Sequence, residues 1–87
     1  MKKILMKSEQ AQSRAQVADF LRDLATKIES NSVVLKQGKD TVELDIPDQV
    51  ELEIEVEQKK KAGKPTKMEL EIEIEWYKGK TENVTLA

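Results

Sequence analysis

Hydrophobic and charged residues alternate almost without error over two stretches of the chain, residues 50–57 and 68–76. Because successive side chains of a β-strand point to opposite faces, a period of two predicts strands with one dry and one hydrated face. We expect strands over 50–58 and 67–77 that pair as a hairpin with a long loop. Pairing would bring eight glutamates onto one face: Glu51, Glu53, Glu55, Glu57, Glu69, Glu71, Glu73 and Glu75.

A helical period follows Ser13. Ser13 and Gln16 have the spacing of a capping box, in which each side chain binds the backbone amide of the other residue, so we expect a helix to begin there. The aliphatic residues then recur at helical spacing and form one stripe: Val17, Leu21, Leu24 and Ile28. Asn31 is the best candidate for a left-handed residue after the end of the helix.

Three shorter strands are predicted, over residues 2–7, 33–36 and 41–46. Gly38 can supply a positive φ in the turn between the last two strands, and Pro47 ends the third because proline has no amide to donate. The resulting order is β-α-β-β-β-β. The most economical way to bury these faces is an α+β two-layer sandwich, with one helix packed on a mainly antiparallel four- to five-stranded sheet.

A chain of 87 residues is expected to form one domain, over residues 1–77. Residues 78–87 would be a C-terminal tail that is disordered or adds a short strand through Val84 and Leu86. The apolar run after Lys3 is too short for a signal peptide, and no segment approaches the length of a transmembrane helix. We therefore expect a cytoplasmic protein without a membrane partner.

Composition removes several kinds of chemistry. The chain has no cysteine and no histidine, which excludes disulfides, thiolate metal sites and the commonest general base. Charged residues make up 37% of the chain, yet the net charge is only −2, so a globally basic nucleic-acid binder is not expected. We therefore expect neither enzyme activity nor a cofactor.

The predicted face of glutamates is the first candidate site. We expect Glu43 and Asp45 to extend it, with three lysines placed to neutralise it: Lys3, Lys7 and Lys36. Neighbouring strands lie about 4.8 Å apart, so mutual repulsion should raise the pKa values of the glutamates. Three interpretations are open: a solubilising face that resists aggregation, an electrostatic docking surface for a basic partner protein, or a weak divalent-cation surface.

Two aromatic residues and a lysine-rich loop are further candidates. Trp76 continues the dry face and is either a core residue or, with Tyr77 on the opposite face, an interface aromatic. The lysine-rich loop, residues 59–67, either offsets the charge of the sheet or contacts phosphate. It lacks the glycine spacing of a phosphate-binding loop.

This combination resembles the Amphi-Trp domain family of small prokaryotic proteins. The residues that carry the resemblance are the helix segment 13–25, Pro47, the run 50–57 and the closing run 69–76, which ends in tryptophan. Together they span about residues 4–76. The resemblance implies a bacterial or archaeal source and assigns no catalytic residues.

Three functions follow as hypotheses. The first is a non-enzymatic interaction or accessory module that uses the acidic sheet face. The second is a homo-oligomer, such as a homodimer, assembled through a sheet edge, because long strands expose long hydrogen-bonding ladders unless they are covered. The third is a weak divalent-cation or small-ligand binder, which would have to rely on carboxylates, lysine or Tyr77.

Overall fold

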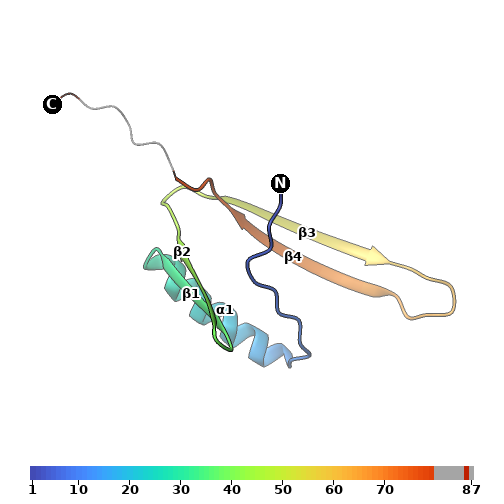
Figure 1. Ribbon diagram of the computed structural model, residues 1–87. Helices are drawn as coiled ribbons and strands as arrows, with labels where there is room; N and C mark the ends of the chain where they lie inside the picture. The colour runs from blue at the N-terminus through green and yellow to red at the C-terminus, as the bar shows by residue number, and fades with distance from the viewer. Residues whose placement is uncertain (80–85, 87) are drawn as a thin grey trace. The chain divides into compact units, whose positions relative to one another are not determined.

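The computed structural model describes residues 1–79 and 86 of the chain. Its elements follow in this order (Figure 1): α1 (Arg14–Glu29), β1 (Ser32–Gln37), β2 (Asp40–Asp45), β3 (Glu51–Lys59) and β4 (Lys67–Glu75). The strands form two antiparallel two-stranded sheets, β1–β2 and β3–β4. The α+β class is therefore confirmed. The chain divides into two compact units, Met1–Asp48 and Gln49–Ala87.

Helix α1 begins where the sequence predicts, because Ser13 and Gln16 form a complete capping box. The Gln16 amide donates to Ser13 Oγ (3.0 Å), and the Ser13 amide donates to Gln16 Oε1 (2.9 Å). These bonds satisfy two backbone donors that would otherwise lack partners. The helix ends at Glu29, and Asn31 follows with a φ of 62°. The prediction of Asn31 as the left-handed residue is confirmed.

In the first unit, α1 packs beside β1. Val33 on β1 and Ile46 just after β2 are the buried hydrophobic residues of the described chain, at 3% and 8% exposed. The Ile46 amide donates to the Asn31 carbonyl oxygen (2.8 Å), which ties together the two ends of the β1–β2 hairpin. Gly38 opens the two-residue turn of this hairpin with a φ of 59°, a value that glycine adopts without strain.

The second unit is built on a long, regular hairpin. Strands β3 and β4 have 9 residues each and pair in one continuous register, from Glu51 opposite Glu75 to Lys59 opposite Lys67. The period-two prediction is confirmed for both strands. The predicted boundaries are displaced by one residue at each end of β3 and by two at the end of β4.

Two features of the predicted fold differ from the structure. The four strands divide into two sheets, whereas the pattern predicts one sheet of four to five strands. Pro47, which lacks an amide donor, lies in the link between β2 and β3. The predicted first strand, residues 2–7, has no strand structure, and its three lysines are typical of a segment that resists edge pairing. Gln37 Nε2 donates to the Lys7 carbonyl oxygen at its end (3.1 Å).

The two-layer sandwich and the single domain over residues 1–77 stay predictions. The strand predicted through Val84 lies outside the described residues. Within the part of the chain that the structure describes, no helix has both the length and the apolar composition needed to cross a membrane.

Candidate functional site

The register of β3 and β4 sets glutamate opposite glutamate four times. We call these eight residues the acidic face; the opposed pairs are Glu51 with Glu75, Glu53 with Glu73, Glu55 with Glu71, and Glu57 with Glu69. Like charges directly opposite each other destabilise a sheet. Lysine at these positions of one strand would replace each repulsion by an attraction. The opposed glutamates therefore lower the stability of the hairpin.

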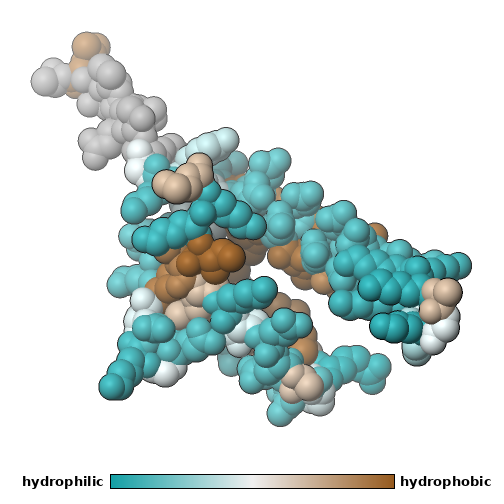
Figure 2. All heavy atoms as spheres, turned by 45° about the vertical axis from the view of Figure 1, so that its right-hand side comes forward, coloured by the Kyte–Doolittle hydropathy of each residue, from teal (hydrophilic) through white to brown (hydrophobic). Residues whose placement is uncertain are grey.

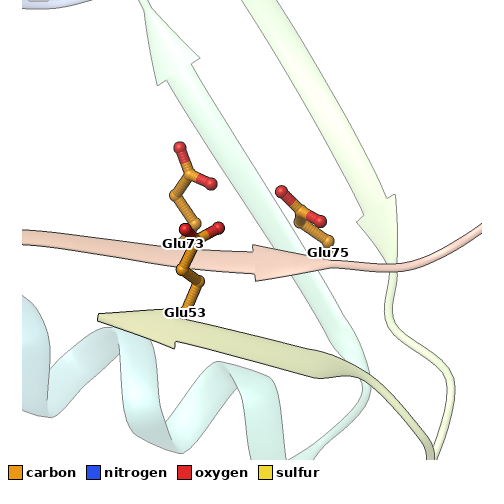
Figure 3. A group of neighbouring side chains, drawn as sticks. All are labelled: Glu53, Glu73 and Glu75. Carbon is orange, nitrogen blue, oxygen red and sulfur yellow. The ribbon is translucent and has the colours of Figure 1, made fainter. Parts of the chain in front are cut away.

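Three carboxylates crowd together where β4 ends. Glu53 on β3 and Glu73 and Glu75 on β4 lie close together (Figure 3), and each offers a carboxylate oxygen within 4.8 Å of the other two. Repulsion by Glu73, together with a hydrogen bond to it, raises the pKa of Glu53. A hydrogen bond to Glu73, followed by repulsion from that carboxylate, raises the pKa of Glu75. This end of the acidic face therefore holds protons more readily than isolated glutamates do.

Two lysines neutralise the other end of the acidic face, beside the loop. Lys59 Nζ lies 3.1 Å from Glu69 Oε1 and 4.0 Å from Glu57 Oε2. Lys67 Nζ lies 3.3 Å from the same Glu69 oxygen. Hydrogen bonds from Lys59 and Lys67 lower the pKa of Glu69, and the bond to Glu69 raises the pKa of Lys59. The acidic face is thus electrostatically uneven along its length.

The predicted rise in glutamate pKa is confirmed for Glu53 and Glu75 and wrong for Glu69. The reason is the position of Lys59 and Lys67, which occupy the last register pair of the strands. Both have odd numbers, so they continue the glutamate side of the alternation. This parity in the sequence was the signal that could have placed them on the acidic face.

The other charged residues expected around the acidic face belong to the first unit. The predicted neutralising lysines precede β3, on the N-terminal segment and on β1: Lys3, Lys7 and Lys36. The two carboxylates expected to extend the acidic face lie on β2, in the other sheet: Glu43 and Asp45. The expectation that Glu43 and Asp45 extend the sheet of the acidic face is wrong, because it assumed a single sheet. That Lys3, Lys7 and Lys36 neutralise the acidic face stays a prediction.

Two groups of carboxylates could each present three oxygens to a cation. They are Glu53, Glu73 and Glu75, and Glu57, Glu69 and Glu71. Calcium takes about six to eight oxygen ligands, often a mixture of carboxylates, carbonyls and water. Both groups lie on an open strand surface, and Lys59 and Lys67 already engage the second one. The arrangement suits loose association with cations better than a tight site.

The reverse side of the hairpin is hydrophobic. We call seven residues at even positions the apolar face: Leu52, Ile54, Val56, Met68, Leu70, Ile72 and Ile74. The first six are 51–67% exposed, and Ile74 is half-buried. A sheet of only two strands has no second layer of its own to cover this face, so the expectation that these side chains complete a buried core stays a prediction. Figure 2 shows apolar side chains at the surface beside hydrophilic ones.

The candidate aromatics follow the end of β4 and are not part of the strand. Trp76 is half-buried, and Tyr77 is 94% exposed. Of the lysine-rich loop, Lys59 and Lys67 belong to the strands, and the remaining three lysines are exposed between them: Lys60, Lys61 and Lys64. Tyr77 and these lysines are accessible to a partner.

The first unit contains a hollow of about 480 Å³ that the sequence analysis did not anticipate. Its lining includes Phe20 from α1, Leu35 and Lys36 from β1, and Lys7 from the N-terminal segment. Apolar and basic residues thus line the same hollow. No residue pattern pointed to it, because its lining comes from three segments that only the fold brings together.

The model of the Amphi-Trp domain family matches residues 1–86 of the chain. The matched range contains α1, both hairpins and Trp76. No curated protein matches the chain, and no solved structure does. The resemblance predicted from the helix and the two alternating runs is confirmed.

Proposed function

The chain belongs to the Amphi-Trp domain family, and from the geometry of its second hairpin we propose a non-enzymatic interaction module whose acidic face docks a basic partner protein. The observation that carries this proposal is the set of four glutamate pairs opposed across β3 and β4. Lysine or arginine from a partner would relieve repulsion that the free protein retains, so charge complementarity would favour and orient the complex.

The spacing of the carboxylates suits a partner that is extended or regularly charged. Glutamates on one strand recur at every second residue, about 6.6 Å apart, and the two rows are separated by about 4.8 Å. Basic side chains at alternate positions of an extended segment would match this repeat. The end with Glu53 and Glu75 gains most from an added cation, because their pKa values are already raised by repulsion.

We propose no catalytic role for the acidic face. Its carboxylates lie on an open strand surface, whereas catalytic groups are typically held in clefts that exclude water. Glu53 and Glu73 are both exposed, so a bound substrate would stay hydrated there. We propose that the protein docks its partner in the cytoplasm of a bacterium or archaeon.

The proposal is tested by affinity capture from a bacterial lysate at low salt. The acidic-face variant carries Glu→Gln at four central positions: Glu53, Glu55, Glu71 and Glu73. The control variant loses the same charge from exposed carboxylates of the first unit: Glu9→Gln, Asp23→Asn, Glu29→Gln and Asp48→Asn. Quantitative mass spectrometry should show basic proteins that wild type and control capture and that the acidic-face variant loses by about tenfold.

Comparison of the three proteins distinguishes an effect of the acidic face from an effect of the net charge of the protein. Equal capture by all three proteins would refute docking on the acidic face. Equal loss by both variants would show that only net charge matters and would also refute it. Because the acidic-face substitutions remove repulsion, we expect this variant to remain folded.

The hollow in the first unit favours a second candidate function, the binding of a small anionic ligand. Its volume lies within the usual range of ligand pockets, about 300–1,000 Å³. Lys7 and Lys36 would meet the charge of the ligand, and Phe20 would meet an apolar part. Binding at this hollow would be unaffected by substitutions on the acidic face, which distinguishes the two functions.

A further inference from the structure

The apolar face of the β3–β4 hairpin is unusual for a protein surface. Within the second unit, six of its seven side chains are more than half exposed. Contiguous apolar patches on soluble proteins are generally small, and larger ones mark surfaces that another molecule covers. A two-stranded hairpin is also marginally stable by itself in water. Both arguments indicate that the apolar face is covered when the protein functions.

The composition of this surface restricts what covers it. Between the ends of the strands its positions hold six aliphatic residues, one methionine and, opposite Met68, one uncharged polar residue, Gln58. Every charged residue of β3 and β4 lies on the other side of the ribbon. Two identical copies of such a surface can therefore meet without burying a charge. Their acidic faces would point away from each other into water.

We propose that two copies of this chain form a homodimer in which the apolar faces of their β3–β4 hairpins pack against each other. A two-fold axis between the hairpins would make this contact isologous, so that the same residues are used on both sides. Two sheets packed in this way lie about 10 Å apart. This dimer differs from assembly through a sheet edge, because it leaves the backbone ladders unpaired and buries side chains.

The area of the apolar face is sufficient for a dimer of modest affinity. Strands of 9 residues give a ribbon roughly 30 Å long and, for two strands, roughly 10 Å wide. Burying one large aliphatic or methionine side chain removes roughly 100 Å² of apolar surface from water. The six exposed side chains of the apolar face therefore give on the order of 600 Å² in each copy, or about 1,200 Å² in total. This is the lower end of specific interfaces. We therefore expect a dissociation constant in the micromolar range.

A single introduced cysteine tests the packing directly, because the natural chain contains none. Any cross-link must then join two copies. Ile54→Cys lies near the middle of β3 on the apolar face, and Glu55→Cys is its neighbour on the acidic face. With a short bis-maleimide at micromolar protein concentration, we expect covalent dimer from Ile54→Cys and at least about tenfold less from Glu55→Cys.

Either of two results would overturn the proposal. Equal cross-linking of both variants would indicate random collision. Failure of both would show that the apolar faces of two copies do not meet, which leaves another protein, a membrane or another part of the same chain to cover this surface. Cross-linking is read after circular dichroism has shown that each variant retains the wild-type strand signal.

Sedimentation velocity provides an independent measurement on the unmodified chain. The weight-average mass should rise from monomer toward dimer between about 1 and 300 µM, as a micromolar dissociation constant requires. Ile54→Lys should remain monomeric over this range, and the control Glu55→Lys should dimerise like wild type. A wild-type protein that stays monomeric throughout would contradict the proposal even if Ile54→Lys failed to fold.

Discussion

Glu53 and Glu69 have the same side chain and lie on the same face of the same hairpin, yet their neighbours shift their pKa values in opposite directions. Glu53 stands opposite Glu73, and Glu69 receives hydrogen bonds from Lys59 and Lys67. The position along the strands therefore decides whether a glutamate favours or opposes the fold. The alternation of the glutamates predicts their shared face, and the difference between them follows only once Lys59 and Lys67 are placed on that face as well.

This contrast predicts opposite effects for the same substitution. Glu53→Gln removes repulsion and should raise the thermal midpoint at pH 7 and low salt by a few degrees. Glu69→Gln removes a carboxylate that two lysines stabilise, so it should lower the midpoint. Thermal unfolding followed by circular dichroism measures both. Shifts in the same direction would show that the neighbours identified here do not govern the stability of these positions.

The β3–β4 hairpin as an element couples stability to pH. Because the pKa values of Glu53 and Glu75 are raised on folding, the folded hairpin binds more protons than the unfolded chain as the pH falls toward these values. Its free energy of unfolding should rise accordingly. Glu69 has the opposite effect on stability, because its pKa is lowered on folding. The ionised carboxylate stabilises the folded hairpin, and this stabilisation is lost as the pH falls through the lowered pKa. The raised pKa of Lys59 matters only at high pH.

We therefore predict that the thermal midpoint rises between pH 7 and pH 5 and falls again in stronger acid, where Glu69 becomes protonated. Melting curves at constant low ionic strength measure this. The rise should be smaller in Glu53→Gln, which has lost one of the two responsible groups. A midpoint that falls steadily from pH 7 to pH 5 would contradict the pKa shifts on which the prediction rests.

The local elements followed from the sequence because their signals are local. The Ser13–Gln16 box marks the start of α1, Asn31 marks its end, and the period of two marks β3 and β4. The prediction of a strand over residues 2–7 was wrong, because a short apolar run becomes a strand only if it can pair with the edge of a sheet. The pairing of glutamates across the hairpin also followed, since every register that keeps the apolar residues of both strands on one face sets glutamates on the other.

In the whole molecule, the sequence predicted which faces are apolar but not what they meet. The period of a strand identifies its dry side, yet the same pattern is compatible with one large sheet or with two hairpins. The structure has two, and each belongs to its own compact unit. The hollow beside Phe20 was likewise invisible, because its lining converges from three segments. Such long-range relations depend on tertiary packing and not on local periodicity.

Recognition of positive charge by the acidic face is tested most directly with a defined basic ligand. A fluorescent peptide of alternating lysine and serine can be titrated with three proteins: wild type, the four-glutamine acidic-face variant and the first-unit control of equal charge. At 50 mM salt we expect the acidic-face variant to bind at least about tenfold more weakly than the control. All affinities should fall as salt is raised to 200 mM. Equal affinity of the two variants would contradict the proposed function.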